Sequence, residues 1–271
     1  MRKEFNYVDV AFVVDTTGSM GPFLEEAKKR LIDALERLSS KNDIDLRVGL
    51  VQYKDHPPQD SSFVTKHLDF SSKMNDMRNA IKALSPSGGG DTPEAVYQGL
   101  YDACEKLHWR PNSSRFILLV GDAPPHAFPA WLKRMLPLKD VRSGGDAWPN
   151  ACPSGLDVSK VTALAEKKGI TIHTVCLAGC ALTEDAFLAL ASGAGGRTAS
   201  RLQSESVIDK IMAMLEEEFL QIGFDMNLYE TIAKTKVFDC QKLAETVGST
   251  KQKVASSVAR LGRRGFLDSV N

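Results

Sequence analysis

Short runs of apolar, often β-branched residues alternate with longer amphipathic stretches along most of the chain. This alternation is typical of βαβ units around a mostly parallel, buried sheet. The second and third runs lie close in sequence, so they could form an antiparallel hairpin at one sheet edge. The runs predict strands at 8–14, 46–53, 63–70, 116–120 and 171–177.

The first amphipathic stretch has apolar residues at spacings of three and four, which predicts a helix that packs on the sheet. These residues are Leu24, Ala27, Leu31, Leu35 and Leu38. Further helices are expected at 73–83, 93–107, 157–168, 183–191 and 207–219. The predicted fold class is therefore α/β, with a doubly wound, mostly parallel sheet flanked by helices over residues 1–224.

Residues 225–271 differ in character from the rest of the chain. Strand-like runs stop, and eight basic residues stand against five acidic residues, a net charge of +3. Two short helices are predicted at 240–247 and 251–261, joined by a glycine-containing turn at 248–249. We therefore predict a second, small helical domain over residues 225–271.

The composition of the 271-residue chain narrows the function classes. Its 34 basic and 34 acidic residues produce no overall field that would attract nucleic acid or acidic substrates. Asp9 interrupts the apolar N-terminal segment, and no apolar run elsewhere approaches a membrane span. The five cysteines are scattered, as expected of reduced thiols rather than a disulfide framework. These features predict a cytoplasmic protein with no membrane partner.

A long insertion at 123–156, rich in proline and glycine, follows the predicted strand 116–120. It is too long for an ordinary connection between a strand and a helix. Open α/β sheets bind ligands at the carboxyl ends of their strands. We therefore expect this insertion to form a lid or a surface near a functional site.

The first strand runs directly into Asp15, Thr17 and Ser19, in the stretch VVDTTGSM. An aspartic protease is excluded, because its Asp-Thr-Gly motif occurs twice, whereas a threonine interrupts it here and no second copy exists. A haloacid-dehalogenase-type phosphatase with Asp15 as the nucleophile matches in part and stays an alternative. In an extended loop, residues 15, 17 and 19 point the same way, so one carboxylate and two hydroxyls converge. Such oxygen ligands suit Mg²⁺ or Mn²⁺.

These residues resemble the Asp-X-Ser/Thr-X-Ser motif of the von Willebrand factor type A family and its metal-ion-dependent adhesion site. GGGDTPEA at 88–95 resembles the family's second loop, and LLVGDAPPH at 118–126 resembles the third. Thr17 stands where the family usually has serine, and it keeps the hydroxyl. The resemblance covers residues 7–222 and implies a divalent-ion site made of Asp15, Thr17, Ser19, Thr92 and Asp122.

The low negative charge of the ligands in such a site indicates what the bound ion would attract. A dication held by only two carboxylates and neutral hydroxyls stays electrophilic, so it favours a further carboxylate from outside. We therefore expect a protein partner that supplies Glu or Asp, and no enzymatic activity. DAPPH at 122–126 and the insertion also resemble family members found in intracellular proteins, including those attached to alpha-kinases.

Plainer roles exist for several of these residues. Thr92 and Pro93 could simply begin a helix, with Thr92 as its N-cap. Asp91 is expected to support its loop, and His126 could contact a ligand or brace the insertion. Around the last predicted strand, a zinc site is an alternative to buried core thiols. Its ligands would be His173, Cys176 and Cys180.

The segment 241–267 resembles a helix-turn-helix of winged-helix type, with 265–267 where the wing strand begins. Its second helix would present four side chains to phosphates and base edges. These are Lys251, Gln252, Arg260 and Arg263. Contact with DNA is one interpretation, and a small interaction or dimerisation module with solvated basic residues is the other.

Overall fold

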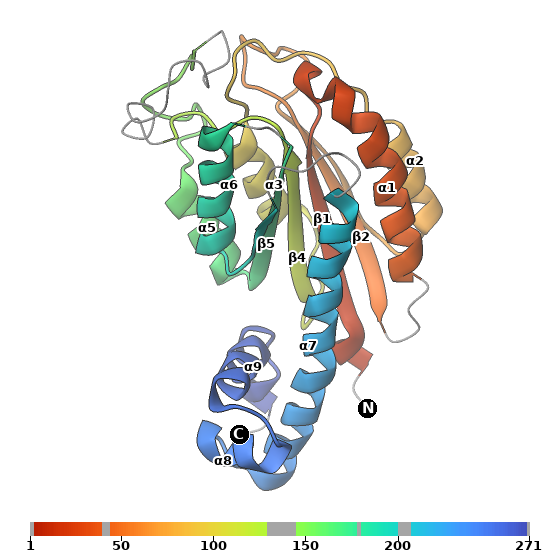
Figure 1. Cartoon of the computed structure of the whole chain (residues 1–271), viewed down its shortest axis with the longest axis vertical. Coiled ribbons are helices and arrows are strands. Elements are labelled where there is room, and N and C mark those ends of the chain that lie inside the picture. Colours follow the sequence, from red (N-terminus) through yellow and green to blue (C-terminus); the bar gives the residue numbers. More distant parts are fainter. Residues whose placement is uncertain (1–2, 40–43, 129–144, 178–179, 200–206, 270–271) are drawn as a thin grey trace.

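The computed structural model describes residues 3–39, 44–128, 145–177, 180–199 and 207–269 (Figure 1). Their strands form a six-stranded sheet in the order β3-β2-β1-β4-β5-β6. Neighbouring strands are parallel, except that β2 and β3 form an antiparallel pair. The mostly parallel sheet and the hairpin at its edge are thus confirmed. The strands are β1 (Tyr7–Asp15), β2 (Asp45–Tyr53), β3 (Thr65–Ser71), β4 (Ser114–Gly121), β5 (Ile170–Cys176) and β6 (Thr198–Ala199).

The central strand β1 is buried on both faces, which explains its nearly unbroken apolar sequence. Val10 and Phe12 belong to the core under one helical layer, and Ala11 and Val13 belong to the core under the other. The first layer consists of α1 (Gly21–Ser39), α2 (Met74–Lys82) and the first part of α7 (Val207–Thr235). The second consists of α3 (Val96–Lys106), α5 (Val158–Lys167) and α6 (Ala181–Gly193). The doubly wound arrangement is therefore confirmed.

Helix α7 joins the sheet to the C-terminal helices without a break. It has 29 residues, and Figure 1 shows it leaving the sheet layer and running on to α8 and α9. The predicted domain boundary at 224 falls inside this helix, where no linker exists. None of the helices in the described ranges combines the length and apolar character that a bilayer crossing requires.

The C-terminal helices α8 (Cys240–Val247) and α9 (Lys251–Arg263) form where the sequence predicts them. Asp239 caps α8 by accepting hydrogen bonds from two backbone amides, and Gly248 ends it with a φ of 64°. The expected wing strand at 265–267 is wrong, because a 3-10 helix begins at Leu267. Phe266 is buried and stacks on Phe5, with ring centroids 4.0 Å apart.

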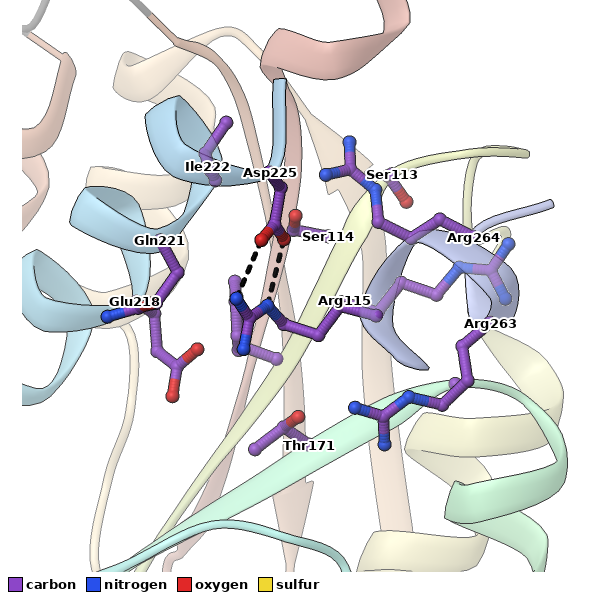
Figure 2. A pocket seen from close by; sticks show the side chains of 13 residues that line it. Ser113, Ser114, Arg115, Thr171, Glu218, Gln221, Ile222, Asp225, Arg263 and Arg264 are labelled. Atoms are coloured by element: carbon purple, nitrogen blue, oxygen red, sulfur yellow. Dashed lines mark hydrogen bonds and ion pairs between the residues drawn. The ribbon is translucent and has the colours of Figure 1, made fainter. Parts of the chain in front are cut away.

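An ion pair attaches α9 to the side of α7. Asp225 accepts hydrogen bonds from Arg260 Nε at 2.8 Å and Arg260 Nη2 at 2.6 Å, and a third from Ser257 Oγ. Figure 2 shows Asp225 in the pocket between these helices and the sheet, with dashed lines to its carboxylate. Arg260 is thus engaged inside the protein and is removed from the predicted nucleic-acid contacts. The other three, Lys251, Gln252 and Arg263, are exposed.

Candidate metal centre

The carboxyl ends of β1 and β4 bring Asp15 and Asp122 to one edge of the sheet. Asp15 is the last residue of β1, and Asp122 follows Gly121, the last residue of β4. The two strands are parallel neighbours, with Val14 opposite Val120, so their ends lie side by side. Open α/β sheets bind ligands at this edge.

A glycine loop lies directly over this edge. Gly18 N donates a hydrogen bond to Gly88 O at 2.9 Å, which joins the loop to the turn after β1. Gly88 and Gly89 have φ angles of +76° and +85°, a region that disfavours residues with a Cβ. A Cβ on Gly89 would also lie 3.0 Å from Glu94 Oε1. Glycine at these positions therefore lets the loop close over the carboxyl groups.

Hydrogen bonds join four of the five predicted ligands. Asp15 Oδ1 accepts from Thr17 N at 2.8 Å and from Thr17 Oγ1 at 2.7 Å. Ser19 Oγ lies 3.3 Å from Thr17 Oγ1 and donates to Asp122 Oδ1 at 2.9 Å. The fifth residue, Thr92, lines the same hollow as Ser19. The structure thus gathers all five side chains from three loops.

The electrostatics of Asp15 fit a bound cation. Asp15 is fully buried, and its Oδ2 has no hydrogen-bond partner in the described part of the chain. Burial, and then the negative charge of Asp122, raises the pKa of Asp15 to about 7. A divalent ion would offset both effects, and carboxylate and hydroxyl oxygens are the ligands that a hard dication prefers.

Glu94 is a further acidic member of this centre that the sequence did not reveal. It is buried, and its Oε2 has no hydrogen-bond partner within the described ranges. Burial, and then the charges of Asp15 and Asp55, raises the pKa of Glu94 to about 11. The signal for this role is its position two residues after Thr92, in the stretch where the sequence predicts the start of a helix.

The interpretation of Thr92 as a helix cap is wrong. Helix α3 begins at Val96, with Ala95 as its N-cap. Glu94 N instead donates to Pro124 O at 2.9 Å, so the second loop is hydrogen-bonded to the third. Thr92 is therefore left in the loop that faces the centre.

His126 contacts the insertion, as one of its two predicted roles requires. His126 Nδ1 lies 2.9 Å from Asp146 Oδ1, in the described part of the insertion. Asp91 supports the same segment, since its Oδ2 accepts from Ala147 N at 2.6 Å. These contacts place the end of the insertion beside the centre.

The alternative zinc site gains no support. His173 is buried, and its Nδ1 accepts a hydrogen bond from Arg197 N at 3.2 Å. Within the described ranges, one group of three His, Cys, Asp or Glu residues has its ligand atoms close together, and it contains neither His173 nor the nearby cysteines.

Comparison with known families agrees with this geometry. The sequence model of the von Willebrand factor type A domain matches residues 9–213, which include part of β1, all of the other five strands and both helical layers. The chain belongs to the von Willebrand factor type A domain family. The match includes all five residues of the candidate centre.

Two curated relatives share part of this von Willebrand factor type A domain. The chain is 30% identical over 150 residues to the alpha-protein kinase vwkA of Dictyostelium discoideum, covering 55% of this chain and 22% of the kinase. It is 29% identical over 118 residues to vitrin of Bos taurus, covering 43% of this chain and 17% of vitrin. The chain thus spans about a fifth of the length of each.

Solved structures share the fold of the domain. Proximal thread matrix protein 1 from the mussel byssus, in a form with a zinc-occupied MIDAS motif, superposes with a TM-score of 0.52 at 16% identity. That alignment covers 77% of this chain and 44% of the mussel protein. The pilus adhesin SpaC from Lactobacillus rhamnosus GG has a TM-score of 0.55 at 16% identity, over 80% of this chain and 30% of the adhesin.

Proposed function

We propose that this von Willebrand factor type A domain binds a partner protein through a divalent ion at the sheet edge. The residues that would hold the ion are Asp15, Thr17, Ser19, Thr92 and Asp122. One observation carries the proposal: hydrogen bonds run from the fully buried Asp15, whose second oxygen has no partner among the described residues, through Thr17 and Ser19 to Asp122.

The chemistry of the donors favours docking of an acidic side chain. Mg²⁺ or Mn²⁺ bound by hydroxyls and two carboxylates would accept a further carboxylate, supplied by Glu or Asp of the partner. We propose binding rather than catalysis, because Asp15 is 0% exposed and its Oδ1 already accepts two hydrogen bonds. Phosphoryl transfer would need this carboxylate open to a substrate.

A cytoplasmic location belongs to the same proposal. No disulfide bond joins the five cysteines, which all lie within the described ranges, and this is consistent with a reducing compartment. The resemblance of DAPPH to intracellular family members supports the same location.

Partner capture tests the docking proposal. We expect the immobilised chain to retain a partner in Mg²⁺ and to lose it in EDTA or with Asp15→Ala. Asp33→Ala, at an exposed aspartate on α1, is the matched control and is expected to behave as the wild type. Equal recovery of the partner in Mg²⁺, in EDTA and with Asp15→Ala would reject metal-dependent docking.

The helix-turn-helix interpretation of α8 and α9 stays a prediction with a separate test. If α9 contacts DNA, binding weakens steeply with salt, and Lys251→Ala and Arg263→Ala reduce the salt slope by about one each. Arg260→Ala is unsuitable for this test, because it leaves the buried Asp225 without its positively charged partner. If the chain causes no electrophoretic mobility shift of any DNA at low salt, the exposed basic residues do not bind DNA. They are then either solvated or in contact with a protein.

A further inference from the structure

Three residues beside the proposed ion site form a second cluster of metal-binding groups. Asp55 lies two residues beyond β2, Asp91 precedes Thr92, and His126 lies in the loop after β4. One ligand atom from each lies within 4.8 Å of the other two. This trio shares no member with the five residues assigned to the first ion.

His126 is held in one orientation by its neighbours. Its Nδ1 lies 2.9 Å from Asp146 Oδ1, while its Nε2 lies 2.6 Å from Asp55 Oδ1. Asp146 is itself fixed by backbone amides of Ala127 and Trp148, at 3.0 and 2.9 Å. A carboxylate that binds one imidazole nitrogen is how proteins commonly orient a histidine whose other nitrogen binds a metal.

Two oxygens of the cluster lack hydrogen bonds. Asp55 is 0% exposed, and its Oδ2 has no partner in the described part of the chain. Asp91 Oδ1 is also buried without a partner there, although Asp91 Oδ2 accepts from Ala147 N. Leaving two buried carboxylate oxygens unpaired is costly unless a proton or a metal cation binds them. Both oxygens belong to the trio that already includes the oriented imidazole.

The charges of the cluster also call for a cation. The carboxyl groups of Asp55, Asp91 and Asp146 face the single imidazole of His126. One imidazolium cannot balance three carboxylates. A dication that displaces the proton between His126 Nε2 and Asp55 Oδ1 into solvent would leave His126 neutral, would reduce the remaining negative charge and would satisfy both unpaired oxygens.

We propose that Asp55, Asp91 and His126 bind a second divalent ion, a first-row transition metal such as zinc, with Asp146 as the positioning residue for His126. The mixed donor set decides the metal class. Imidazole together with carboxylates suits zinc, whereas magnesium prefers oxygen donors alone, as in the Asp15 centre. The second ion would cross-link the loop after β2, the glycine loop and the insertion. It would therefore stabilise the loops beside the Asp15 centre.

Zinc retention in excess Mg²⁺ tests this site separately from the first one. The chain is stripped with EDTA and dialysed against Zn²⁺ with Mg²⁺ in excess to fill the oxygen-only centre, and bound zinc is then measured by elemental analysis. We expect one zinc per chain in the wild type and in Asp15→Ala. His126→Gln and Asp55→Asn are expected to weaken zinc binding at least about tenfold, and Asp146→Asn about ten- to hundredfold.

His108→Gln is the matched control, because His108 is exposed and paired with an aspartate outside this cluster. Zinc binding that survives His126→Gln and Asp55→Asn, or that disappears in Asp15→Ala, would overturn the proposal. X-ray absorption at the zinc edge of the wild type gives a readout that does not depend on how the variants fold. One imidazole with oxygen ligands supports the site, whereas oxygen alone or a sulfur ligand refutes it. Failure here leaves Mg²⁺-dependent docking at Asp15 intact.

Discussion

Replacing Asp15 with asparagine is expected to stabilise the metal-free protein at neutral and alkaline pH. The asparagine keeps an acceptor for Thr17 N and Thr17 Oγ1, which both donate to Asp15 Oδ1, but it removes the buried negative charge. Burial and Asp122 raise the pKa of Asp15 from 3.8 to about 7. A shift of roughly three units corresponds to about 4 kcal/mol at about 1.4 kcal/mol per unit.

The sign of the effect follows from proton binding. The folded state holds the proton of Asp15 more tightly than the unfolded state, so this group contributes its full stability below about pH 4. That contribution is lost as the pH rises to about 7, where the carboxyl ionises in the folded protein. In EDTA at pH 8, the free energy of unfolding of Asp15→Asn should therefore exceed that of the wild type by up to about 4 kcal/mol. Near pH 4 this difference should vanish.

Urea unfolding at a series of pH values, in EDTA and then in Mg²⁺, measures this difference. Magnesium at 100 times its dissociation constant should stabilise the wild type by about 2.7 kcal/mol and the variant far less. Asp33→Asn, at an exposed position, should change stability by less than about 0.5 kcal/mol. The reasoning fails if Asp15→Asn is less stable than the wild type in EDTA at pH 8, or if the difference does not change with pH.

Three further variants test other parts of the structure. Gly89→Ala, at a φ of +85°, should lower stability by about 1–2 kcal/mol in thermal unfolding, and an unchanged midpoint would contradict the strained loop. Glu94→Gln should alter metal-free stability at pH 7 by less than about 1 kcal/mol, because the raised pKa keeps Glu94 neutral there, whereas a large gain in urea unfolding would show an ionised side chain. Asp225→Ala leaves Arg260 without its carboxylate and should lower the free energy of unfolding by about 3–5 kcal/mol. Amide hydrogen exchange in α9 should become faster, and protection equal to the wild type would show that the ion pair does not hold α9 on α7.

The central strands of the sheet were predictable because they are buried on both faces. In β1 the alternate residues enter two separate cores, so nearly every position is apolar and the run stands out in the sequence. Strand β6, with two residues at Thr198–Ala199, is too short to leave any periodicity. The composition changes near 225, but this change does not interrupt α7. A glycine such as Gly223 costs a helix only about 1 kcal/mol, which the packing of α7 exceeds.

The five candidate ligands could be located because each lies in a recognisable motif next to a strand end or loop. Glu94 and Asp55 could not, since their roles depend on which loops meet in space. Threonine followed by proline favours a helix that begins directly after Thr92. Because Glu94 N is hydrogen-bonded to Pro124 O, α3 instead begins at Val96. The same limit applies to Phe266, which stacks on Phe5 from the opposite end of the chain instead of entering a strand.

The unbroken course of α7 separates two surfaces at opposite ends of the molecule. The sheet edge with Asp15 and Asp122 lies where β1 ends, and α8 and α9 lie beyond the other end of the sheet (Figure 1). Because a continuous helix and the Asp225–Arg260 pair connect them, neither end swings freely on a linker. A protein docked at the metal and a second molecule on the C-terminal helices would therefore be held at a set spacing and angle, without competing for the same surface.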